Sequence, residues 1–152
     1  MKSEPETFSI ADLQRDGESL WDGVRNFRAR NFMKNEMAVG DLVLFYHSNA
    51  KPPGVAGLAR VSSETLPDPT QFKAKSQYFD ERSTKDNPRW WLVKVAFVEA
   101  FERFVPLPEL REDPALEGMP LLEKGMRLSV QPVEKQHFQH ILRLAKAKTK
   151  LR

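Results

Sequence analysis

The sequence predicts an α+β fold, a small and partly closed β-barrel of five or six strands with helices around it. Its 152 residues correspond to one domain and are enough to bury a core. Hydrophobic residues make up 40% of the chain and aromatic residues 10%, which is typical of globular proteins and not of disordered ones. Strand-like and helix-like patterns both occur, which favours the mixed class.

Helical patterns occur at four places along the chain. Ser9 is a suitable N-cap for a short helix that Gly17 ends. Residues 25–35 form the second helix, and residues 106–117 form a short helical region that two prolines interrupt. Residues 134–146 carry apolar side chains at the i, i+3, i+4 and i+7 positions, which predicts an amphipathic helix.

Five segments have the composition of β-strands, rich in β-branched and aromatic residues. They are residues 19–21, 42–47, 55–61, 90–101 and 127–130. Gly57 lies inside the third segment, which indicates a bulge or the close approach of another backbone. The stretch between the third and fourth segments is expected to be mostly loop with short helical turns.

Composition limits the class of protein. The chain has no cysteine, which excludes disulfides and cysteine–zinc sites and fits a reducing compartment. No apolar run approaches the ~20 residues that span a bilayer, and no signal peptide opens the sequence. We therefore expect a cytoplasmic protein, or a nuclear one if the source is eukaryotic, with no membrane partner.

Charge is distributed unevenly along the chain. The net charge is +3, but the last ten residues carry five basic side chains and no acid, which leaves the remainder at −2. Residues 1–24 sum to −4 and residues 25–60 to +4. We predict a single domain at residues 1–145, followed by a mobile basic tail at residues 146–152. The positive segment is either a footprint for phosphates or an ordinary solvated face.

Residues 21–48 combine the side chains that a flipped nucleobase requires. Aromatic rings, amides and arginines occur close together in this stretch. Rings offer flat apolar faces, amides hydrogen-bond to base edges, and arginines bind phosphates. No metal-ligand set, phosphate-binding loop or catalytic-triad spacing accompanies them, so no cofactor, metal or catalytic residue is predicted.

Ten short segments, in the same order along the chain, resemble the EVE domain family. They are MKSEPE, FSIADL, WDGVRN, ARNF, FYHSN, PGVAGL, DPTQF, DNPRW, RFVPL and RLSVQP. The resemblance implies a PUA-like fold, related to YTH and SRA domains, and a reader of modified cytosine or another modified base in DNA or RNA. Members commonly carry an aromatic-rich strand before KSEP. Because this sequence lacks it, we expect either a natural start upstream of Met1 or a late translation start, which affects the first strand and part of one pocket wall.

The predicted site has a base pocket and a phosphate-binding part. The base pocket comprises Ser3, Trp21, Asn26, Tyr46, Ser48 and Trp90. The phosphate contacts are Arg25, Arg28, Arg30, Lys34 and Lys51. Resemblance to YTH domains implies a cage role for Trp21, and its alternative role is in the core. Asn26 is either an N-cap or a contact to a base edge.

Two histidine arrangements carry no predicted chemistry. His47 precedes Ser48, but adjacent strand residues point to opposite faces, so they cannot form a Ser–His nucleophile. Tyr46 and Ser48 share the other face, which we assign to the pocket mouth. The last helix carries three polar residues at every third position, which could suggest a metal site. Residues with this spacing do not stay on one side of a helix, so we predict a solvated or half-buried face instead. The three are Glu134, His137 and His140.

The predicted function is a non-catalytic module that binds nucleic acid carrying a flipped, modified base. Any consequence of binding is expected to come from an effector protein acting in trans. The alternatives are a small RNA-processing or hydrolytic enzyme of PUA-like fold, and a protein that binds a free nucleoside or metabolite. Salt dependence separates the last class, because phosphate contacts make binding strongly dependent on salt.

Overall fold

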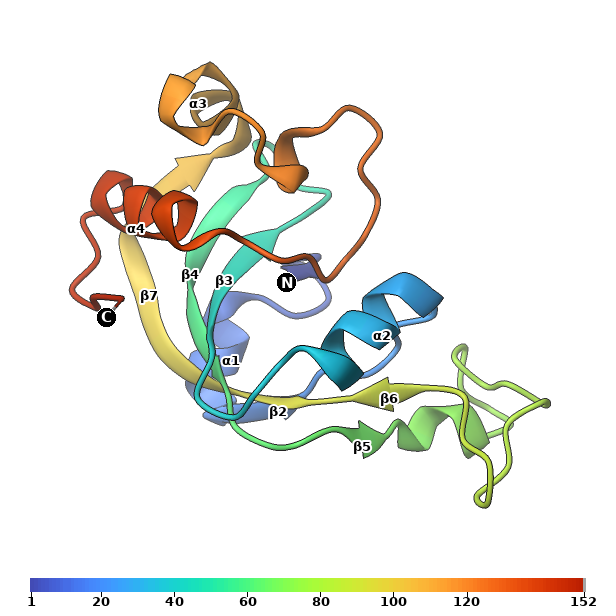
Figure 1. Ribbon diagram of the computed structural model, residues 1–152. Coiled ribbons are helices and arrows are strands. Elements are labelled where there is room, and N and C mark those ends of the chain that lie inside the picture. The colour runs from blue at the N-terminus through green and yellow to red at the C-terminus, as the bar shows by residue number, and fades with distance from the viewer. Residues whose placement is uncertain (152) are drawn as a thin grey trace.

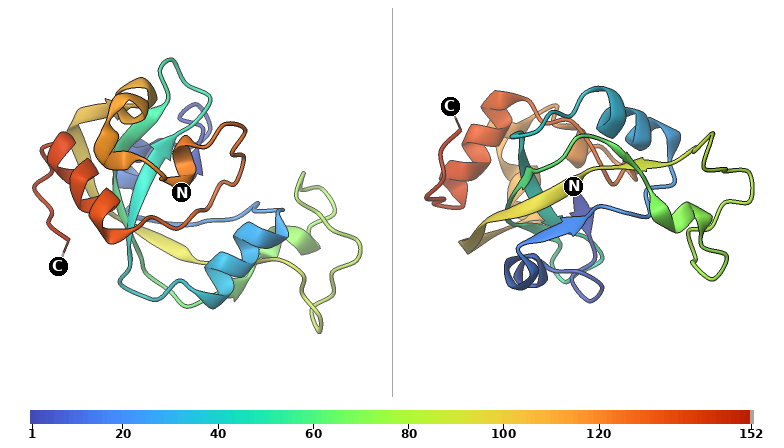
Figure 2. Two further views of the ribbon diagram at one scale, coloured as in Figure 1. Left: turned by 45° about the horizontal axis from the view of Figure 1, so that its top comes forward. Right: turned by 90° about the horizontal axis from the view of Figure 1, so that it is seen from below.

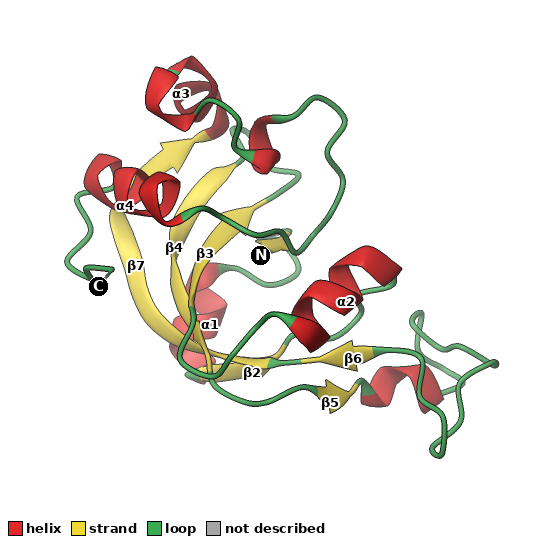
Figure 3. Cartoon of the chain, in the orientation of Figure 1, coloured by secondary structure: helices red, strands yellow, loops and turns green. Residues whose placement is uncertain are grey.

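The computed structural model describes residues 1–151 and is built around one curved, five-stranded sheet (Figures 1 and 3). Its strands are β1 (Lys2–Ser3), β2 (Glu18–Leu20), β3 (Leu42–His47), β4 (Gly54–Val61) and β7 (Lys94–Pro106). They lie in the order β1–β3–β4–β7–β2. All neighbours pair antiparallel except β1, which runs parallel to β3. The predicted α+β class and the five-stranded, partly closed barrel are confirmed.

Helices cover both faces of this sheet. They are α1 (Ile10–Asp16), α2 (Phe27–Asn35), α3 (Leu107–Glu112) and α4 (Lys135–Leu144). α1 begins and ends as predicted, because the Ser9 hydroxyl accepts a hydrogen bond from the Asp12 N–H at 3.1 Å and Gly17 adopts a φ of 80°. α2 and α4 are slightly shorter than predicted. Further short 3-10 turns lie at Pro114–Leu116 (η2) and Pro120–Leu122 (η3).

Alternating residues of β3 divide the core into two layers. Val43 and Phe45 pack in the layer that α1 and α2 cover, whereas Leu44 and Tyr46 pack in the layer of α3 and α4. At Gly57 a Cβ atom would come within 2.7 Å of the Ile10 side chain and would also collide with a β7 carbonyl. The predicted close approach at this glycine is therefore confirmed.

A second, two-stranded sheet extends the fold and was not predicted. It consists of β5 (Leu66–Pro67) and β6 (Trp91–Leu92). The 3-10 turn η1 (Pro69–Phe72) and the loop that follows project away from the barrel (Figures 1 and 2). The continuous strand predicted at residues 90–101 is wrong, because this apolar run supplies strands to two sheets and β7 starts only at Lys94.

One further expectation is wrong. Residues 127–130 form an irregular segment and not a strand. The Lys2 N–H donates to the Ser129 carbonyl at 2.8 Å, and this bond joins the segment to the barrel. The start of the basic tail contacts the barrel. The Glu99 carboxylate accepts hydrogen bonds from the N–H groups of Lys148 and Thr149, both at 2.9 Å.

Within residues 1–151, every helix falls short of the length and apolar character that crossing a membrane demands. The same residues bring no three His, Asp or Glu side chains together in a group that could hold a metal ion. His140 Nε2 lies 2.6 Å from Asp113 Oδ2 instead, which ties α4 to the start of η2.

Candidate nucleic-acid interface

A large open cavity of about 1240 Å³ lies between the first strands of the barrel and the projecting loop. Five separate segments supply its walls; they are residues 2–8, 18–24, 48–49, 77–78 and 127–129. Three of the six predicted pocket residues, Ser3, Trp21 and Ser48, line this cavity together. They are far apart in sequence, and the curved sheet brings them together: β1 pairs with the end of β3 at one edge, β2 forms the other edge, and residues of both edges line this cavity.

Trp21 belongs to both the core and the cavity wall. It follows β2, where its N–H donates to the Val93 carbonyl at 3.0 Å. Its side chain is 8% exposed, and its ring meets Phe45 edge to face with centroids 5.6 Å apart. The indole is therefore packed in the core while part of it lines the cavity, where an aromatic ring can contribute to stacking on a base.

Ser3 and Ser48 are joined through the backbone at the β1–β3 edge. The Ser48 N–H donates to the Ser3 carbonyl at 2.9 Å. The Ser3 hydroxyl donates to the Phe8 carbonyl at 2.6 Å, so its oxygen can still accept a hydrogen bond from a ligand. The cavity thus has a hydroxyl acceptor of fixed orientation on the wall that β1 provides.

An ion pair with a buried carboxylate supports the part of the wall that Gly23 and Tyr78 form. Asp68 is fully buried, and its carboxylate accepts from the Gly23 N–H at 2.8 Å and from Arg25 Nη1 at 3.0 Å. Burial acts to raise the pKa of Asp68, but hydrogen bonds from Thr70, Gly23 and Arg25 outweigh it and hold that pKa below its usual range. Arg25 also donates to the Tyr78 carbonyl at 2.8 Å, which fixes the projecting loop against the barrel.

Tyr78 also lines the cavity, and sequence reasoning missed it. Its ring lies against Gly23, where a Cβ atom would come within 2.6 Å of the ring. A glycine at this point is required both by the contact and by a φ of 81°. The WDG sequence after β2 indicates a turn, but nothing in it predicts an aromatic partner more than fifty residues away.

Charged side chains at the cavity have both signs. Lys2 and Arg127 line it, as do Glu4, Glu18 and Asp22. Desolvation of the carboxyl, followed by the charge of Asp68, raises the pKa of Asp22. Burial lowers the pKa of the Lys2 ammonium. Sequence reasoning missed both cations, although each lies in one of the segments that carry the family resemblance.

The other predicted pocket residues lie outside this cavity. Asn26 caps α2, where its side-chain oxygen accepts from the Ala29 N–H at 3.1 Å. Tyr46 lines a separate cavity of about 30 Å³, with the Lys2 ammonium 5.9 Å from its ring centroid. Trp90 is buried, and its indole N–H donates to Asp80 at 2.7 Å. The expectation that Tyr46 and Ser48 open into the same pocket is therefore wrong, and a bulge between Phe45 and Tyr46 accompanies the change.

None of the five predicted phosphate contacts lines the large cavity. Arg25 is engaged by Asp68, as described above. Arg30 and Lys34 lie on α2 beside aromatic rings, and Lys51 is exposed in the loop after β3.

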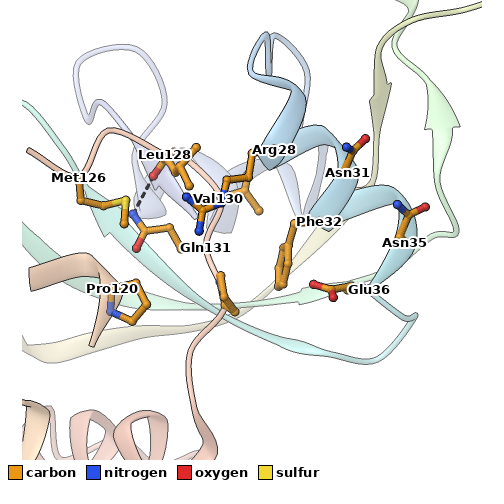
Figure 4. Close-up of a pocket in the computed structure, with 11 residues that line it drawn as sticks. Arg28, Asn31, Phe32, Asn35, Glu36, Pro120, Met126, Leu128, Val130 and Gln131 are labelled. Carbon is orange, nitrogen blue, oxygen red and sulfur yellow. Dashed lines mark hydrogen bonds between the residues drawn. The ribbon is translucent and has the colours of Figure 1, made fainter. Parts of the chain in front are cut away.

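Arg28 lines a second cavity of about 300 Å³ between α2 and the segment before α4. In Figure 4 it extends from α2 toward Gln131 on the opposite wall. Residues 126–130 separate this second cavity from the large one: Met126, Leu128 and Val130 line the second, whereas Arg127 and Ser129 line the large one.

His47 has a structural role. Its Nε2 accepts a hydrogen bond from the Ile10 N–H at 3.1 Å, at the start of α1. Burial lowers the pKa of His47, which favours the neutral ring that this bond requires. The imidazole is thus engaged on the α1 side of the sheet, while the neighbouring Ser48 lines the cavity.

Comparison with known proteins gives consistent matches over most of the chain. The model of the EVE domain matches residues 1–144. The chain is 42% identical to thymocyte nuclear protein 1 of Homo sapiens over 162 residues, which cover 95% of this chain and 72% of that protein. It is 43% identical to the protein of the same name from Danio rerio, over 95% of this chain and 70% of that protein.

Solved structures show the same architecture. A protein from Pseudomonas putida superposes with a TM-score of 0.92 at 46% identity, covering 95% of this chain and 97% of its own. The DUF55 domain of human thymocyte nuclear protein 1 gives a TM-score of 0.90 at 41% identity, covering 96% of each chain. The human THYN1 protein in complex with DNA containing 5-methylcytosine gives a TM-score of 0.89 at 40% identity, covering 98% of this chain and 97% of its own.

Proposed function

The chain belongs to the EVE domain family, which has a PUA-like fold, and from this we propose that it is a module that binds nucleic acid carrying a modified base. A modified pyrimidine of the 5-methylcytosine type leaves its stack and enters the large cavity beside Trp21. Two findings support this proposal. A relative 40% identical in sequence has been solved with DNA containing 5-methylcytosine, and the cavity combines an aromatic ring with hydroxyl and cationic groups.

Recognition of the base rests on three kinds of contact. The Trp21 indole stacks on the base, and the Ser3 hydroxyl oxygen accepts a hydrogen bond from an exocyclic amino group. The Asp22 carboxyl, whose pKa is raised by desolvation and then by the charge of Asp68, supplies a second polar contact. The 5-methyl group packs against the apolar side chains of Leu20 and Phe8.

Phosphates are held at the cavity opening. Lys2 and Arg127 lie at the cavity itself, and Lys51 lies in the exposed loop next to the cavity residues Ser48 and Asn49. Burial makes the charged form of Lys2 less favourable, so a nearby phosphate would stabilise that charge. We assign the phosphate contacts to these three cations and not to Arg25, because the Arg25 side chain is paired with Asp68.

Binding without catalysis is the better-supported class. An enzyme that works by nucleophilic catalysis places a nucleophile beside a general base. His47 accepts from the Ile10 backbone, and that bond engages the nitrogen that a base would use. An effector protein that recognises the bound complex accounts for any downstream event. A pocket for a free nucleoside leaves the cations at the cavity opening unexplained.

The proposal is tested with fluorescently labelled oligonucleotides that differ only in one cytosine, either methylated at C5 or unmodified. We expect tighter binding of the methylated strand and no change in either strand after prolonged incubation. Ser3→Ala should weaken binding of both strands by a similar factor, because the exocyclic amino group that Ser3 accepts from is common to cytosine and 5-methylcytosine. Ser62→Ala provides the matched control, because the Ser62 hydroxyl is buried away from the cavity and has no hydrogen-bond partner among residues 1–151. Equal affinities for the two strands in the wild-type protein would overturn the proposal.

A further inference from the structure

Phe27 is an exposed aromatic ring in a fixed position. It is the first residue of α2 and is 47% exposed. Its ring stacks on the buried Trp90, with centroids 4.8 Å apart and planes inclined by 17°. An exposed phenylalanine that rests on a buried indole loses little side-chain freedom when a ligand stacks on it, so the ring is preorganised for binding.

Two arginines lie beside this pair of rings. The Arg30 Cζ atom is 4.6 Å from the Phe27 centroid and 5.8 Å from the Trp90 centroid. The Arg89 Cζ atom is 5.5 Å and 5.9 Å from the same two centroids. A guanidinium beyond the outer face of Phe27 would lie much farther from Trp90 than from Phe27. Both arginines therefore leave that outer face open.

Positive charge around these rings is only partly compensated. Arg89 pairs with Asp80 at 2.9 Å. Within residues 1–151, Arg30 and Lys34 have no carboxylate at ion-pairing distance; Arg30 donates to Asn31 and to the Arg89 carbonyl, and the Lys34 ammonium lies 4.6 Å from the Trp91 centroid. Burial, and then the charge of Arg89, lower the pKa of Arg30. An anion at this position would relieve the repulsion between the two guanidiniums.

Arg25 connects this surface to the large cavity. Its Cζ atom lies 5.2 Å from the Trp90 centroid and 5.4 Å from the centroid of Tyr78, which lines the cavity. α2 itself lies along β6, beside the loop that carries Tyr78 (Figure 1). A strand that leaves the cavity over Tyr78 therefore meets the outer face of Phe27 within a few nucleotides, with phosphates close to Arg30 and Lys34.

We propose that Phe27, Arg30 and Lys34, here called the α2 platform, bind an unstacked nucleotide that neighbours the one in the cavity. Its base stacks on the outer face of Phe27, and its phosphates lie against the two cations. The inference rests on the proposed function, and it adds a second base contact on the same strand. It also gives the protein a preference for single-stranded or locally unpaired nucleic acid around the modified base.

The test uses Phe27→Leu, which keeps apolar contact with Trp90 but removes the ring face, and Phe27→Tyr, which keeps the ring. Binding is measured to a single-stranded oligonucleotide with one 5-methylcytosine, and to versions with an abasic site one or two positions away on either side. We expect Phe27→Leu to weaken binding of the intact strand about tenfold, or ~1.4 kcal/mol, whereas Phe27→Tyr binds as the wild type does. One abasic strand should lose a similar factor with the wild type and almost nothing with Phe27→Leu.

The cationic side chains of the α2 platform are tested in a separate experiment. Lys34→Gln should lower the salt dependence of binding by about one counterion, whereas Lys124→Gln, at an exposed lysine after η3, should leave it unchanged. Melting temperatures establish that each variant is folded. If the wild type prefers the methylated strand but Phe27→Leu and every abasic strand bind normally, the platform is overturned and the proposed function stands. If the wild type shows no preference, the proposed function itself fails.

Discussion

At the scale of single residues, Trp21 has two roles that substitutions can separate. Its ring is part of the core through Phe45 and part of the cavity wall. Trp21→Leu keeps an apolar side chain in the core but removes the aromatic face, so affinity for a methylated oligonucleotide should fall by about tenfold, as stacking is worth ~1–3 kcal/mol. Isothermal titration and a thermal melt of the same sample measure the two effects. Wild-type affinity in a folded Trp21→Leu protein would show that the indole serves the core alone.

A substitution at Arg25 tests whether this predicted phosphate contact has a structural role instead. The Asp68 carboxylate is buried and has Arg25 as its cationic partner. Arg25→Gln leaves that carboxylate without its partner, which should reduce the free energy of unfolding by about 3–5 kcal/mol. Urea denaturation measures this loss. Unchanged stability together with a weaker salt dependence of binding would instead restore Arg25 as a phosphate contact.

At the scale of elements, His47 links the β3 end to α1 in a way that depends on pH. Burial lowers the folded-state pKa of His47 from 6.5, so the unfolded chain takes up the proton first as the pH falls. The stability that neutral His47 contributes is thus present above about pH 6.5 and is lost on further acidification. Melting temperatures between about pH 7.5 and pH 5.5 should fall less steeply in His47→Gln than in the wild type.

His140→Gln supplies the control for this pH series. It removes a histidine that contacts Asp113 but leaves the Ile10–His47 bond intact. The variant should retain the acid-side loss that depends on His47. Identical slopes for the wild type and His47→Gln would mean that His47 does not govern this transition.

The elements also show which signals a sequence carries. β3 and the helix after Ser9 were predictable because a dense apolar and aromatic run and a capping residue are local signals. β5 and β6 were not, because a two-residue strand has no alternation to detect. The wall at Tyr78 depends on an ion pair between residues 43 positions apart and on the missing side chain of Gly23. Such long-range contacts leave no pattern in the neighbouring sequence.

The predicted site was recovered in part for the same reason. Ser3, Trp21 and Ser48 meet at one cavity because they end or follow strands of one sheet. Asn26 and Trp90 have the residue types of a base pocket but are engaged by α2 and by Asp80. Side-chain chemistry alone could not distinguish these two groups, since the difference lies in which face of each element is covered.

At the scale of the whole molecule, the two basic regions should differ in what they contribute. Lys2 and Arg127 lie at the cavity, whereas Lys146, Lys148 and Lys150 belong to the tail beside β7. Arg127→Gln should lower the salt dependence of specific binding by about one counterion and reduce the preference for the methylated strand. Replacing the three tail lysines by glutamine should weaken both strands by the same factor. The variants are compared by measuring both affinities across a salt series. If only the tail variant lost the preference for the methylated strand, the tail would be what positions the nucleic acid on the protein.

The proposed function requires that the modified base occupies the cavity beside Trp21. The most direct measurement is an NMR titration of isotope-labelled protein with an oligonucleotide that carries one 5-methylcytosine. We predict nuclear Overhauser effects between the 5-methyl protons and the Trp21 indole, with shifts at the Ser3 and Ser48 amides. The second cavity offers an equally concrete alternative. Contacts from the same methyl group to Phe32 or Met126, with Trp21 unaffected, would contradict the account.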